Sequence, residues 1–153
     1  MEEEFIAVYD KYKNDVFRIA FSYTKSITDA EDITQNVFIK LFNKFNDLKG
    51  QDYIKKWLVK VTINESKSII YSCWKKRIKF FENQNDSTCK TEVKIDETLE
   101  NILKLPKKER LIIHLYYYEG YSVKEIAEIM HISNSNVKTI LFRARKKLKE
   151  ELV

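Results

Sequence analysis

Basic and aromatic side chains recur at helical spacing in the middle of the chain. Intervals of three and four residues place them on one face of a helix. Lysine ammonium groups attract phosphate, and aromatic rings stack on unpaired bases for about 1–3 kcal/mol each. This face would therefore bind nucleic acid whose bases are open. Its members are Tyr53, Lys56, Trp57, Lys60, Asn64, Lys67, Tyr71 and Trp74.

A second polar group lies near the C-terminus, where residues 138–149 hold six basic residues and no acidic one. Asn, Ser, Thr, Lys and Arg supply the donors and acceptors that read base edges in the major groove, and a Phe ring can contact a thymine methyl. We predict that this face reads duplex DNA; the alternative is a solvated basic face on a helical hairpin. The face holds Asn134, Ser135, Lys138, Thr139, Phe142, Arg143 and Lys146.

A third polar group lies opposite an apolar helix face in the first third of the chain. On spacing alone it is either a partner-binding surface or a solvated face, and the second is the commoner case. Its members are Asp29, Asp32, Gln35, Asn36 and Lys40.

The sequence contains no recognisable catalytic motif. Cys73 and Cys89 lie sixteen residues apart without a CxxC pattern, and His114 and His131 form no ligand cluster with them. Phosphate-binding glycine loops, dinucleotide motifs and nucleophile elbows are missing from the sequence. We expect two free thiols and a protein that is not an enzyme, with no metal, cofactor or small-molecule substrate.

Three helices are expected to position the basic and aromatic face of the middle of the chain and the polar face at residues 29–40. Apolar spacing predicts one helix from Phe5 to Tyr23. A capping box at residues 28–31 predicts the start of the next, whose apolar face comprises Ile33, Val37, Phe38, Leu41, Phe42 and Phe45. After a break at residues 46–52, a long helix is expected from Tyr53 to about Arg77. Its core side would hold Ile54, Leu58, Val61 and Ile69, and core packing is the alternative reading for Trp57 and Trp74.

The C-terminal third has the pattern of a helix-turn-helix. Pro106 lies in the first turn of one helix, and Gly120 ends that helix. A capping box at residues 122–125 begins the next helix, and Ser133 caps the last one. His131 stands in the turn where glycine is commoner, so a left-handed backbone there would be somewhat strained.

Composition and charge favour two small helical domains. The chain has 153 residues, 44% of them apolar, with only 2 Gly and 1 Pro, which favours long helices over barrels and sandwiches. Residues 51–79 carry 8 basic and 2 acidic side chains and residues 103–153 carry 11 and 6, whereas residues 80–102 between them carry 2 and 6. We therefore predict domains at 1–80 and 96–153, a flexible linker at 81–95, and two contacts with one polyanion.

The lengths of the apolar runs and the charge of the N-terminus predict where the protein resides. No apolar run approaches the ~20 residues that span a bilayer. Residues 2–4 are all glutamate, where a signal peptide would be basic. We expect a cytoplasmic protein.

Two sets of motifs resemble the sigma-70 family of RNA polymerase sigma factors, most closely its short extracytoplasmic-function group. Residues 123–130 (VKEIAEIM) and 137–148 (VKTILFRARKKL) resemble region 4, as does the preceding LPKKER at 105–110. Residues 29–40 (DAEDITQNVFIK) resemble region 2, and so does the stretch from Trp57 to Lys67. The two sets stand in the family's order over most of the chain, and region 3 of longer relatives has no counterpart.

This resemblance implies a promoter-recognition subunit that binds core bacterial RNA polymerase reversibly. The face with Asp32 and Gln35 would dock on the clamp coiled coil of the largest polymerase subunit. The basic and aromatic face would read and open the −10 element, and the face at residues 134–146 would read the −35 element. An anti-sigma factor is a further implied partner. The loop matching the one that captures a flipped −10 base comprises Leu48, Lys49, Gly50, Gln51, Asp52 and Tyr53.

Two alternatives remain open on the sequence. A stand-alone helix-turn-helix regulator, usually dimeric with half-sites ~34–36 Å apart, would explain residues 103–153 but leave the first half unused. A nuclease would need acidic residues to hold Mg²⁺ near the basic face, and no such cluster is visible there.

Overall fold

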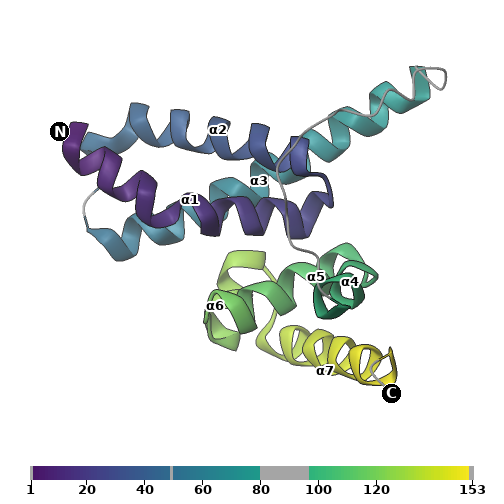
Figure 1. The fold of residues 1–153 in the computed structure, drawn as a ribbon. Coiled ribbons are helices and arrows are strands. Elements are labelled where there is room, and N and C mark those ends of the chain that lie inside the picture. The colour runs from purple at the N-terminus through teal and green to yellow at the C-terminus, as the bar shows by residue number, and fades with distance from the viewer. Residues whose placement is uncertain (1, 49, 80–96, 152–153) are drawn as a thin grey trace. The chain divides into compact units, whose positions relative to one another are not determined.

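The structure is a computed structural model that describes residues 2–48, 50–79 and 97–151 (Figure 1). Side chains are described for these residues except Gln51, 70–79, 97–99 and 150–151. Over these ranges the chain forms helices and no strand, as the sequence predicts. It divides into two compact units, Met1–Glu92 and Val93–Val153. The predicted linker at 81–95 lies outside the described residues.

The first unit packs three helices against one another. These are α1 (Glu2–Thr24), α2 (Ile27–Lys44) and α3 (Gln51–Lys79), with a short 3₁₀ turn, η1 (Phe45–Asp47), after α2. Each helix contacts the other two. Their apolar stripes face inward and form the core, which includes Val8, Tyr12, Val16, Ile19, Ala20, Ala30, Ile33, Val37, Phe38, Leu41, Ile54, Leu58, Val59 and Ile63.

The start of α2 corrects one prediction. The N-cap is Ser26, whose hydroxyl accepts from the backbone N–H of Asp29 at 3.2 Å, so the helix begins at Ile27 and Thr28 lies within its first turn. The predicted capping box at 28–31 was therefore two residues late. Lys25 adopts a left-handed backbone (φ 58°) just before this cap, which ends α1 and reverses the chain.

The start and the core side of α3 also differ from the prediction. The helix begins at Gln51 rather than Tyr53, directly after Gly50 (φ 93°), which takes a conformation that favours glycine. Val61 and Ile69 are only half-buried, whereas Thr62 and Ser66 are fully buried. Their hydroxyls donate to carbonyls of their own helix, at 2.6 Å for Thr62 and 2.7 Å for Ser66, so a short polar side chain can be buried there satisfied.

The second unit contains the predicted helix-turn-helix. It consists of α4 (Glu97–Leu103), α5 (Lys107–Ile113), the π-helical turn η2 (His114–Tyr118), α6 (Val123–Met130) and α7 (Asn134–Glu151). Pro106 occupies the N-cap of α5, one residue before the first turn in which it was expected. The core includes Leu111, Ile112, Leu115, Ile126, Ala127, Val137, Ile140, Leu141 and Ala144.

The predicted signals around α6 and α7 are confirmed. Ser122 and Glu125 form a reciprocal capping box, with hydrogen bonds of 3.1 and 3.2 Å. His131 is left-handed, with φ 56° and ψ 43°. Ser133 Oγ accepts from the backbone N–H of Asn136 at 3.0 Å and so begins α7. The left-handed His131 and the Ser133 cap set where α6 ends and where α7 begins.

Candidate nucleic-acid interface

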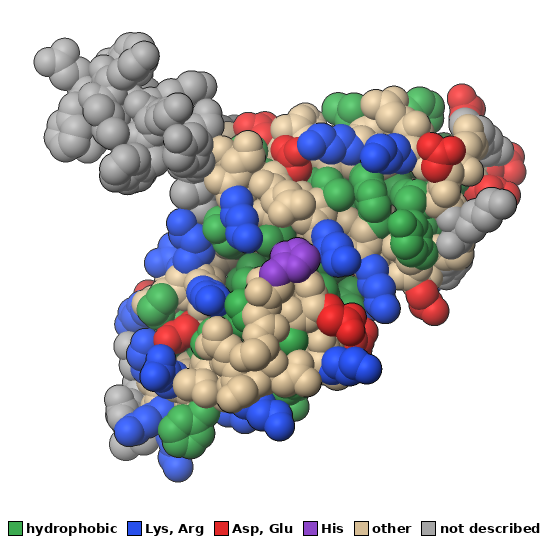
Figure 2. All heavy atoms as spheres, turned by 180° about the vertical axis from the view of Figure 1, so that it is seen from behind, with side chains coloured by type: hydrophobic (Ala, Val, Ile, Leu, Met, Phe, Trp, Pro, Cys, Tyr) green, Lys and Arg blue, Asp and Glu red, His purple; other side chains and the backbone are tan. Residues whose placement is uncertain are grey.

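The polar face of α7 is exposed over its whole predicted length. All seven predicted residues, from Asn134 to Lys146, are exposed, and Phe142 presents 68% of its surface to solvent. Val137, Ile140 and Ala144 on the opposite side are buried and hold the helix on its unit. The Thr139 hydroxyl donates to the Ser135 carbonyl at 3.0 Å, which leaves its oxygen able to accept from a base edge. Lys and Arg side chains gather over α7 at the lower left of Figure 2.

The basic and aromatic face of α3 is also exposed where the structure describes it. Tyr53, Lys56, Lys60, Asn64 and Lys67 are exposed, and Trp57 is half-buried at the edge of the face. Trp57 thus fits neither of its two predicted environments fully. The side chains of Tyr71 and Trp74 lie outside the described residues. On the first unit, Figure 2 shows Lys and Arg side chains beside a group of hydrophobic ones.

The loop that precedes α3 borders an open hollow. This hollow, of about 490 Å³, is lined by Leu48 and Gly50 of the loop together with residues of α1, η1 and α3. Its lining combines apolar side chains such as Val8, Phe45 and Ile54 with the polar Glu4, Lys11 and Asn46. Asp52 is exposed, whereas Lys49 and the side chain of Gln51 lie outside the described residues. Sequence spacing around residues 48–53 does not indicate the contribution of α1.

The exposed face of α2 holds apolar side chains that the sequence analysis missed. Asp32, Gln35, Asn36 and Lys40 are exposed as expected, and Asp29 is half-buried. Ile39 lies among them with 60% of its surface exposed.

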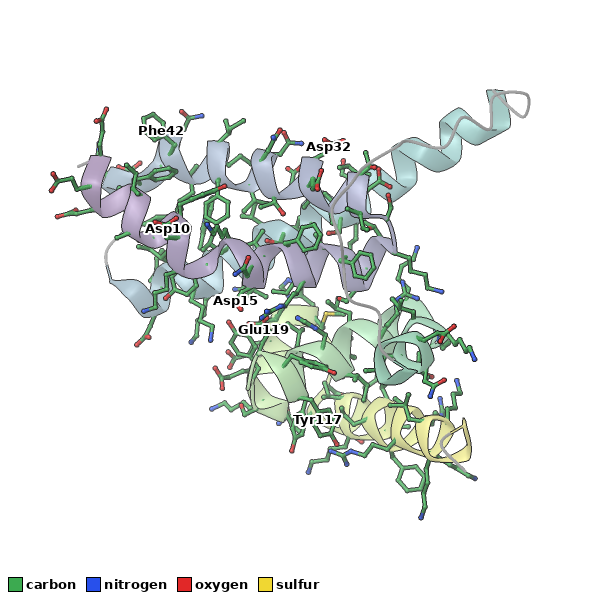
Figure 3. All side chains as sticks on the ribbon, viewed as in Figure 1. Asp10, Asp15, Asp32, Phe42, Tyr117 and Glu119 are labelled. Carbon is green, nitrogen blue, oxygen red and sulfur yellow. The ribbon has the colours of Figure 1, made fainter. Side chains whose placement is uncertain are left out.

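Phe42 corrects a further prediction, because it was assigned to the apolar core face and is 50% exposed. Its ring meets that of Phe5 edge-on, with centroids 5.2 Å apart, and the other side of the ring is open. Asp32 and Phe42 mark the two ends of this exposed face (Figure 3). The spacing of Asp32, Gln35, Ile39 and Phe42 by three and four residues was the available signal.

A groove between α2 and α3 brings together residues from two predicted sets. It measures about 410 Å³ and is lined by Lys40, Asn43, Lys44, Trp57, Val61, Asn64 and Glu65. Lys40 forms an ion pair with Glu65 across the groove. Lys40 was predicted with the partner-binding face, and Trp57 and Asn64 with the nucleic-acid face. The two predicted surfaces therefore meet at this groove.

The described residues contain no group of three His, Cys, Asp or Glu side chains placed to hold a metal ion. No described helix combines the length and the apolar character that crossing a bilayer requires.

Comparison with known families matches both units. Residues 8–72 match the model of sigma-70 region 2, and residues 96–148 match that of sigma-70 region 4. The two matches include most of the residues singled out above, among them the exposed faces of α2, α3 and α7.

Individual relatives agree over nearly the whole chain. The chain is 32% identical to the ECF RNA polymerase sigma factor SigM of Bacillus subtilis, over 93% of this chain and 91% of that protein. It is 30% identical to SigV of the same organism, over 92% and 86%. In fold it resembles the sigma factor RpoE of Bartonella quintana, solved in complex with the anti-sigma factor NepR. That likeness has a TM-score of 0.78 and 20% identity and covers 99% of this chain and 95% of the other.

Proposed function

The chain belongs to the extracytoplasmic-function group of the sigma-70 family of RNA polymerase sigma factors. We propose which of its surfaces binds polymerase and which surfaces bind the promoter. A sigma factor binds core RNA polymerase reversibly and directs initiation at particular promoters. In this division α2 docks on polymerase, α3 with its preceding loop opens and reads the −10 element, and α7 reads the −35 element.

The exposed face of α2 is the observation that carries the proposal. Ile39 and Phe42 stand 60% and 50% exposed among polar residues of this face. Apolar anchors inside a polar rim are typical of protein interfaces, where a few such side chains dominate the binding energy. We assign this face to the clamp coiled coil of the largest polymerase subunit. The docking set is Asp29, Asp32, Gln35, Asn36 and Lys40, to which we add Ile39 and Phe42.

The first unit also supplies the −10 surface in this proposal. Separating and flipping a base costs a few kcal/mol, so the protein must offset the lost stacking. The hollow behind Leu48 and Gly50 has room for a heterocyclic base beside the apolar side chains of its lining, Val8, Phe45 and Ile54. Lys56, Lys60 and Lys67 on α3 would follow the phosphates of the separated strand, while Tyr53 and Trp57 offer rings for stacking.

The exposed face of α7 would enter the major groove at the −35 element. Lys138 and Arg143 lie on this face with Asn134 and Thr139, which gives both charged and neutral donors and acceptors. Each unit alone would bind weakly. Polymerase that fixes their spacing would raise the effective concentration of each for its own element.

The proposal includes a regulator, a location and the absence of catalysis. The RpoE relative is bound by an anti-sigma factor, and a protein of that class is the inhibitor that we propose for this chain. The chain would act in the cytoplasm, where RNA polymerase and the chromosome are located. The chain contributes binding energy and carries out no chemical step of its own.

The direct test is size-exclusion chromatography of the purified chain with bacterial core RNA polymerase at moderate salt. We expect stoichiometric co-elution, and the resulting holoenzyme should start transcripts at defined sites on genomic DNA. If the folded chain, free of any inhibitor, does not co-elute, the stand-alone regulator replaces this proposal.

Two variants separate docking from DNA reading. Ile39→Ser combined with Phe42→Ser should weaken polymerase binding at least tenfold. Truncating a hot-spot side chain at the centre of an interface costs about 2 kcal/mol or more, which is roughly thirtyfold in affinity. The matched control is Lys138→Ala on the second unit, which should bind polymerase as the wild type does. Equal affinity of the double variant and the wild type would refute the docking assignment.

A further inference from the structure

Two basic residues near the C-terminal end of α7 are held in opposite ways. Arg145 and Lys147 are two positions apart, so they project about 200° apart around the helix axis and mark the two edges of its exposed face. Each is fixed by a contact from an earlier part of the same unit. The partners differ in charge. This difference decides how much positive charge and how many hydrogen-bond donors each side chain retains for a further anion.

Lys147 is already neutralised. Its Nζ donates to both carboxylate oxygens of Glu109 on α5, each at 3.1 Å. The pair ties α7 to α5 and cancels the positive charge of this lysine. Lys147 should therefore attract a second anion, such as a phosphate, only weakly.

Arg145 is held by neutral groups. Its Nε donates to the Tyr117 hydroxyl oxygen at 2.5 Å, and its guanidinium carbon lies 5.4 and 5.5 Å from the ring centroids of Tyr116 and Tyr117. The two rings meet edge to face, with centroids 5.0 Å apart. Figure 3 shows Tyr117 beside the α7 ribbon. The guanidinium is thus oriented without loss of its charge.

The remaining hydrogen-bonding capacity of this cluster points outward. A guanidinium has five N–H donors, and Nε uses one of them here. Among the described residues, no hydrogen-bond acceptor is found for the other four. Arg145 is exposed, and Tyr117 is 54% exposed with a hydroxyl hydrogen still to donate. A planar fork beside a hydroxyl matches the oxygens of a phosphate group.

We propose that Arg145, held by Tyr116 and Tyr117, is a binding site for a backbone phosphate at one wall of the major groove that α7 enters. The site rests on the proposed −35 role of α7. Arg145 lies seven residues after Lys138, about 10.5 Å farther along the helix and near the same edge. With Lys138 on the floor of the groove, Arg145 is positioned for its phosphate wall. Such a contact sets the register of the reading helix and is independent of base sequence.

The test measures DNA affinity against salt for full-length holoenzyme on a duplex promoter mapped by transcription from genomic DNA. Losing one phosphate contact on B-DNA reduces the slope of log K against log[salt] by about 0.9. Arg145→Gln should show this smaller slope and about tenfold weaker binding at low salt. Arg145→Lys should keep the slope yet bind less tightly, and Tyr117→Phe should keep the slope with about threefold weaker binding.

The matched control removes the pair at the other edge. Glu109→Gln combined with Lys147→Gln leaves the net charge unchanged, and it should bind DNA with the wild-type slope. Arg145→Met also removes the charge but keeps the aliphatic stem against the rings, so it replaces Arg145→Gln if that variant does not fold. Circular dichroism and polymerase co-elution establish that each variant is folded and docks.

The outcomes separate this site from the proposed function. A neutral Arg145 variant that is folded, docks on polymerase and keeps the wild-type slope would reduce the cluster to a packing contact. If no holoenzyme forms, the proposed function is refuted but the phosphate site is not. The same salt titration of the full chain on a mixed-sequence duplex then still tests the phosphate site, with the same expected loss of slope.

Discussion

The two candidate DNA surfaces are built on different principles. The surface on α7 belongs to one helix, which is capped by Ser133 and held by a buried stripe on its far side. The surface of the first unit is composite, because α1 contributes to the hollow behind Leu48 and α2 contributes Lys40 to the groove beside Trp57. A single-helix surface can be recognised from spacing alone, whereas a composite surface depends on how three helices pack.

This difference has a functional counterpart. Duplex DNA already presents its base edges in the major groove, so a rigid exposed helix is sufficient to read them. Separated strands need pockets and stacking rings that replace the interactions lost on opening. Pockets require several elements, and the three-helix unit supplies them. The predictions below test this contrast, beginning with the largest expected effect.

Truncating the core of the first unit should disable that unit alone. Leu58→Ala, at a side chain that is 1% exposed, should cost about 2–5 kcal/mol. Trp57 and Trp74, the two tryptophans of the chain, both lie in the first unit, so their fluorescence during urea unfolding reports that unit selectively.

The matched control for that experiment is Leu111→Ala in the second unit, at a fully buried side chain. It should move the unfolding transition seen by circular dichroism and leave the tryptophan transition in place. If both variants shift the tryptophan transition equally, the two units do not fold independently.

Removing the cap of α6 should destabilise the helix-turn-helix that carries the reading helix α7. Ser122→Ala deletes one half of a capping box and should cost about 1 kcal/mol of the stability of the second unit. Thermal unfolding of the full chain measures the loss, and binding to −35 duplex DNA should weaken with it. Ser26→Ala, which removes the cap of α2, should by contrast leave −35 binding unchanged. A −35 affinity that falls equally in both variants would contradict the local character of the α7 surface.

Relieving the turn before α7 should stabilise it. His131 has φ 56°, where a side chain other than glycine is disfavoured by about 1–2 kcal/mol. His131→Gly removes that penalty but adds freedom to the unfolded chain, so we expect a net gain of about 0.5–1 kcal/mol. The gain is read from the urea midpoint of circular dichroism. A loss of stability would mean that the imidazole itself makes a stabilising contact in the turn.

Opening the α2–α3 groove should have the smallest effect on stability. Lys40 is 56% exposed, so Lys40→Ala should cost less than about 1 kcal/mol. It would leave the Glu65 carboxylate uncompensated beside Asn64, so formation of open promoter complexes should fall more than polymerase affinity does. Lys40→Ala combined with Glu65→Gln restores the charge balance and should recover opening. A loss of polymerase affinity with unchanged promoter opening would mean that Lys40 acts in docking alone.

Sequence reasoning succeeded where the physics is local. The Ser122–Glu125 box, the left-handed His131 and the exposed polar face of α7 each depend on residues within a few positions of one another, and each is confirmed. It failed at the start of α2, where two hydroxyls two residues apart, Ser26 and Thr28, both suit an N-cap. In the structure Ser26 is the cap, and it directly follows the left-handed Lys25 that ends α1.

Burial was the second source of error. Phe42 was assigned to the core because it is apolar and in phase with Phe38, yet it lies at the margin where α1 covers only one side of its ring. Thr62 and Ser66 were left out of the core because they are polar, yet their hydroxyls are satisfied within α3. Hydrophobicity predicts which face turns inward and does not predict how far the neighbouring helices extend over it.

Residue spacing along the chain is sufficient to predict the all-helical class, the helix-turn-helix and the polar faces of α2, α3 and α7. These follow from periodicity and capping, which act within a single helix. Contacts between helices appear only in the folded chain. Lys40 meets Glu65 across a groove with Trp57, and Tyr117 orients Arg145 at the edge of α7. The partners in these contacts are 25 and 28 residues apart, and no local rule relates such positions until the helices have packed.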